Sequence, residues 1–139
     1  MRQMSDIIFN QHPLIMPASA TVRAACEGMR DKRAGSVLVT DRAGALVGIF
    51  TGRDAVSRII AEGRDADKTT LERVMTKEPM IVSPDVNAVE ALRMMWDFGF
   101  RHLPVCDKGK ILGVVSRGDF RGAEQDRLDE EINLWQRLR

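Results

Sequence analysis

The sequence contains an internal repeat, and this repeat limits the possible folds more than any other feature. When the chain is displaced by 66 residues, matching residues coincide in order: Pro13 and Pro79, Ile15 and Ile81, Ala25 and Ala91, Met29 and Met95, Val39 and Val105, Asp41 and Asp107. After one deletion in a turn the displacement is 65 residues, and further pairs coincide: Gly44 and Gly109, Gly48 and Gly113, Thr51 and Ser116, Asp54 and Asp119. Because the matches keep one order with a single gap, the chain is predicted to be two copies of one unit.

Each copy carries a helical pattern of apolar residues and then a hairpin pattern. Apolar residues at i, i+3, i+4 and i+7 draw one stripe along a helix. The stripe residues are Val22, Ala25, Cys26 and Met29 in the first copy, and Ala88, Ala91, Leu92 and Met95 in the second. Two short apolar runs separated by a turn that ends in glycine predict a β-hairpin in each copy. Its strands are expected at residues 37–39 and 46–50, and at 103–106 and 111–115.

An extended segment is expected before each of these helices, and a further helix after each hairpin. The extended segments are Leu14–Met16 and Met80–Val82, and the further helices begin near Gly52 and Arg117. The predicted fold class is therefore α/β (α+β), with two pseudo-symmetric strand-helix-strand-strand-helix repeats that bury their apolar faces by pairing. The polar residues 63–70 predict a linker. The predicted domains are 1–66 for the first repeat, 67–123 for the second and 124–139 for a C-terminal amphipathic helix.

Composition excludes several classes of protein. The 139 residues are enough to bury a core without disulfides, and 44% hydrophobic with 29% charged residues is typical of a globular domain. The net charge of +1 gives no general attraction to nucleic acid or anionic lipid. No apolar run approaches the roughly 18 residues of a membrane span, and the N-terminus lacks the pattern of a secretory signal. The expected compartment is the cytoplasm.

Cysteine and histidine give no support for a metal site or a Cys/His nucleophile. Cys26 and Cys106 form no CxxC motif, and neither His12 nor His102 lies at metal-ligand spacing from them. Both thiols are interpreted as small buried apolar groups. An enzyme is the least favoured class, since no nucleophile, base and orienting group stand at related positions.

The strongest local signal is a matched segment at the end of each hairpin. Gly48–Asp54 and Gly113–Asp119 both read glycine, two apolar residues, serine or threonine, two residues, and aspartate. Each lies where a strand passes into a helix, and free backbone N–H groups there favour anions. The carboxylate can accept hydrogen bonds from two sugar hydroxyls, and the hydroxyl suits a phosphate. The glycine would let a planar ligand approach the strand closely.

The same spacing is also a helix-capping pattern. In Ser/Thr-x-x-Asp the hydroxyl and the acid satisfy N–H groups that the first helical turn leaves without partners. One such motif taken alone favours the capping interpretation. The strand glycine before it, and the recurrence of both features in the two copies, favour a ligand site.

The chain resembles the tandem cystathionine-β-synthase (CBS) domains, or Bateman modules, from residue 4 to about residue 123. The similarity is carried by Gly35–Val39, Gly48–Asp54, Phe100–Val105 and Gly113–Asp119. The resemblance implies two three-stranded sheets flanked by helices. It also implies two clefts between the copies, which in this family often hold adenosine-containing ligands.

The resemblance further implies roles for individual residues. Asp54 and Asp119 would hold ribose hydroxyls, and Thr51 and Ser116 would assist at ribose or phosphate. Adenine would lie beside the first extended segment of each copy, and phosphates would meet nearby basic residues. The expected ligand-binding residues are Ile15, Met16, Gly48, Thr51, Arg53, Asp54, Ile81, Val82, Arg101, His102, Gly113, Ser116, Arg117 and Asp119.

The two copies differ in the basic residues around the motif. Where the second copy has Arg101–His102, the first has Gly35–Ser36, so the two clefts are expected to differ in phosphate affinity. Arg53 in the first copy corresponds to Gly118 in the second, which partly offsets this difference. The position of His102 is equally consistent with a half-buried strand histidine that binds nothing.

The C-terminal residues form an amphipathic pattern. Leu128, Ile132, Trp135 and Leu138 fall at spacings of 4, 3 and 3, and such a stripe packs either on its own chain or on another. Because CBS modules commonly form dimers through helices, a homodimer contact is favoured. Trp96 is interpreted as packing or interface surface rather than a platform for stacked bases, since aromatic residues make up only 5% of the chain.

The favoured function is a non-catalytic sensor without a required cofactor, which binds a ligand and biases a partner protein that the sequence does not identify. The expected ligand is AMP, ADP, ATP or a related compound such as S-adenosylmethionine or NAD. The alternative is a structural dimerisation module with empty clefts. RNA or DNA binding is less favoured because the net charge is close to zero.

Overall fold

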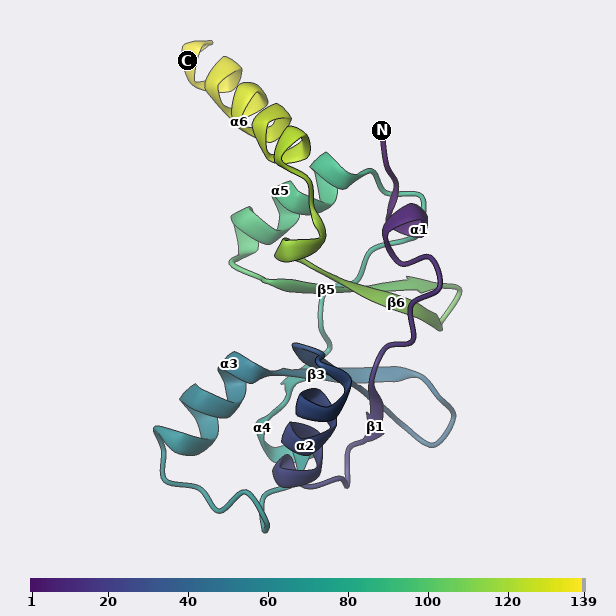
Figure 1. Cartoon of the computed structure of the whole chain (residues 1–139), viewed down its shortest axis with the longest axis vertical. Coiled ribbons are helices and arrows are strands. Elements are labelled where there is room, and N and C mark those ends of the chain that lie inside the picture. The colour runs from purple at the N-terminus through teal and green to yellow at the C-terminus, as the bar shows by residue number, and fades with distance from the viewer. Residues whose placement is uncertain (139) are drawn as a thin grey trace. The chain divides into compact units, whose positions relative to one another are not determined.

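The computed structural model describes residues 1–138, and the chain forms two compact units that are not simply its two repeats (Figure 1). Unit 1 contains Met1–Gln11, Ile81–Asp107 and residues 112–138. Unit 2 contains His12–Met80 together with Lys108–Ile111. The units therefore divide the chain differently from the predicted boundaries at residues 66 and 123.

Unit 2 contains the helix and the hairpin expected of the first repeat, followed by two short elements that the sequence patterns do not predict. Its elements in chain order are β1 (Ile15–Pro17), α2 (Val22–Lys32), β2 (Ser36–Thr40), β3 (Leu46–Thr51), α3 (Gly52–Asp54), the π-helix η1 (Ala55–Ile60), α4 (Leu71–Val74) and β4 (Thr76–Lys77). Thr21 caps α2 by accepting a hydrogen bond from Ala24 N, and Arg33 ends the helix in the left-handed conformation. Gly44 takes a positive φ of 85° in the hairpin turn, as the turn pattern requires.

The sheet of unit 2 has the order β1-β2-β3-β4, with β1 parallel to β2 and the other pairs antiparallel. One face of this sheet carries the core, in which α2 and α4 cover the strand residues. That core contains Val22, Ala25, Met29, Val37, Val39, Phe50, Ile59, Leu71 and Val74. Of the four predicted stripe residues, Val22, Ala25 and Met29 are buried, whereas Cys26 is only half-buried at the edge of this core.

Unit 1 repeats this plan with fewer paired strand residues. Its elements are α1 (Met4–Ile7), α5 (Ala88–Phe98), β5 (His102–Asp107), β6 (Lys110–Ser116), the 3-10 helix η2 (Arg117–Asp119) and α6 (Gly122–Arg137). The first two residues of β6, Lys110 and Ile111, belong to unit 2. Asn87 caps α5 and Gly99 ends it, and the four predicted stripe residues of α5 are all buried. Val82 makes a single parallel bridge to Val105 of β5.

The predicted fold class is confirmed, and the sheets differ from the expectation in their number of strands. Instead of three strands each, they contain four in unit 2 and two in unit 1, where Val82 adds only an isolated bridge. The helix expected near Arg117 is a 3-10 turn that stops at the extended residue Phe120, and α6 begins at Gly122. The further helix of the second repeat and the predicted C-terminal helix are therefore one element.

Two short helices, α1 and α4, which no sequence pattern predicts, occupy matching places in the two units. In unit 2, Leu71 N donates to Ala20 O and Val22 N donates to Thr69 O, both at 2.9 Å. In unit 1, the same pair of bonds joins Met4 N to Val86 O at 2.9 Å and Ala88 N to Arg2 O at 2.8 Å. The repeat thus extends to residues 2–8 and 69–75. Helices of four residues carry no readable periodicity, which is why the pattern did not predict them.

Candidate functional site

In unit 2 the motif turn is closed by a reciprocal pair of hydrogen bonds. Thr51 N donates to Asp54 Oδ2 at 2.9 Å, and Asp54 N donates to Thr51 Oγ1 at 3.2 Å. This is a capping box, in which the two side chains satisfy the N–H groups at the start of α3. The capping interpretation of the motif is therefore confirmed in this unit, and it uses one oxygen of the carboxylate.

In unit 1 the motif acid also binds its own turn. Asp119 Oδ2 accepts a hydrogen bond from Ser116 N at 2.7 Å and another from Ser116 Oγ at 3.2 Å. The acid again caps the strand-to-helix turn through a single oxygen. In both units, whether the acid can also bind a ligand depends on what its other carboxylate oxygen, Oδ1, contacts.

The second oxygens of the two acids differ. Asp54 Oδ1 lies 3.5 Å from an Arg58 guanidinium nitrogen, and the Asp54 side chain is only 16% exposed. Asp119 is exposed, and its Oδ1 makes no hydrogen bond or ion pair with any residue from 1 to 138. A carboxylate oxygen in that condition can accept hydrogen bonds from ligand hydroxyls. Arg58 was missed at the sequence level, although its i+4 position relative to Asp54 on a helix could have indicated the pair.

The strand glycines do not open the sheet to a ligand, which corrects the role expected for them. Gly48 pairs with Val39 on the face that carries the core, and a Cβ built at Gly48 would overlap the Met75 side chain. A Cβ built at Gly113 would lie 2.6 Å from Gln11 Oε1 and 2.9 Å from Ile8 Cβ. Both glycines therefore make room for the chain's own side chains.

The opposite face of the sheet in unit 2 carries exposed Ile15, while Leu38 and Ile49 on the same face are buried. Ile15 lies beside Leu38, and Leu38 pairs with Ile49, so these three side chains share one face. Thr51 lies two residues beyond Ile49 on the same strand and therefore shares this face. Ile15 is 46% exposed, whereas Met16 points to the other face and packs against the core.

Unit 1 shows the same division at its extended segment. Ile81 is 48% exposed, whereas Val82 is buried and bridges Val105. His102 is half-buried, and by strand alternation it lies on the face opposite Val105. Of the four apolar residues expected beside a ligand, Ile15 and Ile81 are accessible and Met16 and Val82 form core contacts.

The basic residues expected near phosphates lie in different environments. Arg53 and Arg101 are exposed. Arg117 instead turns toward α5, where its NH2 group donates to Met95 O at 3.0 Å and its guanidinium carbon lies 4.4 Å from the centre of the Trp96 ring. This cation–π contact gives Trp96 a packing role, in line with the interpretation of that residue.

The backbone of the two motif turns is anchored in the same way. Gly52 N donates to Gly35 O at 3.2 Å in unit 2, and Arg117 N donates to Arg101 O at 3.1 Å in unit 1. In each unit the residue just before the first hairpin strand, β2 or β5, is thereby joined to the first helical residue. The turns share their main-chain geometry and differ in the side chains around them.

The remaining candidate groups are structural in character. Burial raises the pKa of the Cys26 and Cys106 thiols, which keeps both protonated and unreactive at neutral pH. Within residues 1–138, no group of His, Cys, Asp and Glu side chains could hold a metal ion. None of the helices within these residues has the length and hydrophobicity that a membrane span requires.

A family model for the CBS domain matches residues 4–61 and again residues 71–126. The chain belongs to the CBS domain family. Among curated relatives of this CBS pair, the CBS domain-containing protein CBSCBSPB3 of Arabidopsis thaliana is 40% identical over 102 residues. Those residues are 73% of this chain and 18% of the plant protein, so the chain spans about a fifth of that relative's length.

Solved structures of other CBS proteins share the fold. A CBS domain protein from Pyrobaculum aerophilum, complexed with AMP, has a TM-score of 0.81 and 25% identity, with 92% of this chain and 98% of that chain covered. A hexameric CBS-CP12 protein from bloom-forming cyanobacteria has a TM-score of 0.79 and 27% identity, with 86% and 69% covered. The CBS-pair fold of the chain is established by these comparisons.

Proposed function

We propose that this CBS pair is a non-catalytic regulatory module that binds an adenosine-containing ligand, with AMP, ADP and ATP as the first candidates. The observation that carries the proposal is the Asp119 carboxylate, which is held by its turn through one oxygen and is open through the other. The Pyrobaculum aerophilum relative that is complexed with AMP supports the choice of ligand.

The chemistry of the unit 1 turn fits the sugar part of such a ligand. The open Asp119 Oδ1 can accept hydrogen bonds from neighbouring ribose hydroxyls, and a charged acceptor makes these bonds stronger than neutral ones. Ile81 offers an accessible apolar surface beside which a flat base can lie. Arg101 is an exposed cation for the phosphate, and His102 lies next to it at the start of β5.

The turn of unit 2 carries the same groups in a less available state. Asp54 is mostly buried and pairs with Arg58, although Ile15 and Arg53 are accessible. A ribose at this turn has to share the carboxylate with the guanidinium. We therefore propose that the Asp119 turn binds the ligand more tightly than the Asp54 turn does.

The test is calorimetry and thermal shift with AMP, ADP, ATP, S-adenosylmethionine and NAD. A ligand that binds only the folded chain must raise the melting temperature. Asp119→Asn keeps an oxygen for the capping bonds but removes the charge, and we expect it to weaken binding about tenfold, as for one charged hydrogen bond. Asp126→Ala, which removes an exposed acid on α6, is the matched control and should leave binding unchanged. If no compound of the panel binds the unsubstituted chain, the proposal is wrong.

A second role, homodimer formation through α6, is favoured by a specific observation. Leu128 is fully buried with Val89 and Leu92 of α5, while Ile132, Trp135 and Leu138 farther along the predicted stripe are 39%, 64% and 71% exposed. We propose that a second copy covers these exposed residues. Light scattering during size exclusion should give a dimer mass for the unsubstituted chain and a monomer mass for Trp135→Glu. A monomer mass for both would contradict the dimer.

We further propose that ligand binding to this module regulates a partner protein. A ligand can regulate a partner only if it binds one arrangement of the module more tightly than another. We also propose that the module acts in the cytoplasm, a compartment in which adenine nucleotides are present. Pull-down with and without AMP is the measurement that checks for a ligand-dependent partner.

A further inference from the structure

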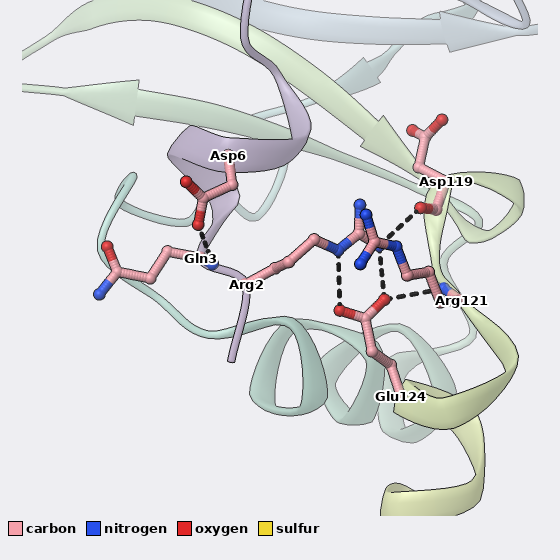
Figure 2. A network of polar contacts seen from close by, with 6 residues as sticks. All are labelled: Arg2, Gln3, Asp6, Asp119, Arg121 and Glu124. Carbon is pink, nitrogen blue, oxygen red and sulfur yellow. Dashed lines mark hydrogen bonds and ion pairs between the residues drawn. The ribbon is translucent and has the colours of Figure 1, made fainter.

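A bidentate ion pair holds the N-terminal segment, residues 1–11, against the rest of unit 1. Arg2 Nε donates to Glu124 Oε2 at 3.0 Å, and Arg2 NH2 donates to Glu124 Oε1 at 2.5 Å (Figure 2). Two parallel hydrogen bonds between a guanidinium and a carboxylate fix orientation as well as distance. The pair joins residues that are 122 positions apart in the sequence.

Glu124 is held firmly enough to serve as an anchor for Arg2. Its side chain is nearly buried, and Oε1 also accepts a hydrogen bond from Arg121 N at 2.7 Å, which caps the start of α6. The hydrogen bonds from Arg2, reinforced by the one from Arg121 N, lower the pKa of the Glu124 carboxyl, so it stays ionised at neutral pH. On the other side, Arg2 O accepts a hydrogen bond from Ala88 N, at the start of α5.

The same guanidinium also reaches the motif turn. Arg2 NH2 donates to the backbone oxygen of Asp119 at 3.0 Å, while the Asp119 carboxylate points away from this contact (Figure 2). Arg2 therefore ties the main chain of the motif acid to Glu124 and leaves the carboxylate free. Phe120, the next residue, is extended, and its N–H closes the 3-10 turn on Arg117 O at 3.3 Å, so helical hydrogen bonding ends there and resumes only in α6.

Unit 2 uses an arginine differently at the equivalent place. Arg58 donates to Val74 O at 2.7 Å and to Thr76 Oγ1 at 3.1 Å, and its NH2 lies 3.5 Å from the Asp54 carboxylate. There the arginine comes from the helix after the motif and engages the acid itself. In unit 1 it comes from the N-terminal segment and engages the carbonyl.

We propose that Arg2 is a positioning residue for ligand binding at the Asp119 turn, acting through its contacts with Glu124 and the Asp119 carbonyl. The inference rests on the proposed function. It assigns the N-terminal segment, far from the motif in sequence, to the binding site of the second repeat. It predicts that loss of Arg2 weakens ligand binding at Asp119 without removing any group that touches the ligand.

The experiment compares Arg2→Met with the unsubstituted full chain by two measurements. Amide hydrogen exchange without ligand should become about tenfold faster at residues 117–120, and AMP affinity should fall about tenfold, the factor expected for one charged hydrogen bond. Arg23→Met removes the exposed Arg23–Asp67 ion pair of unit 2 and is the matched control, which should change neither quantity. Arg2→Lys keeps the positive charge but cannot make the two parallel hydrogen bonds of a guanidinium. Its AMP affinity should therefore lie between that of Arg2→Met and that of the unsubstituted chain.

The outcomes separate the inference from the function on which it rests. Unchanged exchange at residues 117–120, or faster exchange with unchanged AMP affinity, would overturn the positioning role. If Arg2→Met does not fold, Glu124→Gln serves in its place, because it keeps the acceptor for Arg121 N and removes the charge that holds Arg2. If the unsubstituted chain binds no nucleotide, the proposed function fails, and the exchange rates still show whether Arg2 holds the turn.

Discussion

The two motif turns of this chain have nearly the same backbone and different surroundings. In unit 2, Asp54 is mostly buried, and its second oxygen faces Arg58. In unit 1, Asp119 is exposed, and the nearby arginine binds its carbonyl and leaves its second oxygen open. A duplicated motif can therefore supply one acid that is largely committed to the fold and one that remains available to a ligand.

The same contrast extends to the sheet next to each turn. In unit 2, β4 pairs with β3 through backbone hydrogen bonds, with Thr76 opposite Ile49. In unit 1, the Gln11 side chain replaces that strand, because its amide donates to Val114 O at 2.8 Å and accepts from Val114 N at 2.6 Å. Val114 corresponds to Ile49 in the repeat. One unit thus closes its sheet edge with main chain, and the other closes it with a single side chain.

The largest expected effect tests this packing difference at the two strand glycines. Gly113→Ala should lower the free energy of unfolding by about 2–3 kcal/mol, because the new methyl group meets the branched Cβ of Ile8 and the paired amide of Gln11. Gly48→Ala should cost about 1 kcal/mol, because the Met75 side chain is flexible enough to move. Urea denaturation measures both values. An equal loss in the two variants would contradict the proposed difference.

The second prediction tests the two acids directly. Asp119→Ala should remove about 1.5–3 kcal/mol of AMP binding energy, the range for a hydrogen bond to a charged group. Asp54→Ala should remove less, because Arg58 already occupies part of that carboxylate. Calorimetric titration of both variants gives the comparison. Loss of stability without loss of affinity in Asp119→Ala would mean that the acid is only a cap.

The third prediction concerns the side chain that replaces a strand. Gln11→Leu should lower the free energy of unfolding by about 1–2 kcal/mol, because it leaves the N–H and carbonyl of Val114 without their partner. Asn133→Leu, at an exposed amide on α6, is the control and should have little effect. Thermal melting compares the two, and equal melting temperatures would show that the Gln11 contacts add nothing.

The smallest expected effect is a dependence of stability on pH. The pKa of Glu124 is lowered in the folded chain, so the unfolded chain binds its proton more readily. The stabilisation is therefore fully present above the ordinary glutamate pKa and is lost as pH falls through the lower folded value. We expect about 1 kcal/mol for this partly exposed pair. Denaturation curves of Glu124→Gln should lack this acid-side loss, and an unchanged pH profile would contradict it.

Local patterns predicted the helices and hairpins well, and they failed where two faces of a strand had to be distinguished. The spacing of Val22, Ala25 and Met29 identifies a buried stripe because helical periodicity alone decides it. Gly48 was expected to face a ligand, but its register opposite Val39 places it against the core. Strand alternation says that Ile15 and Met16 point opposite ways, yet it does not say which of them meets solvent.

The sequence by itself determined the duplication, the order of the main elements and the residue types of each motif turn. Only the tertiary structure decided that residues 2–8 pack beside the second hairpin, that Arg58 engages one acid, and that Arg2 engages the carbonyl of the other. Helices and hairpins form through interactions between residues that are near in the chain, and the sequence pattern reflects these interactions. The accessibility of a motif acid depends on side chains from other segments, and no sequence periodicity predicts which side chains these are.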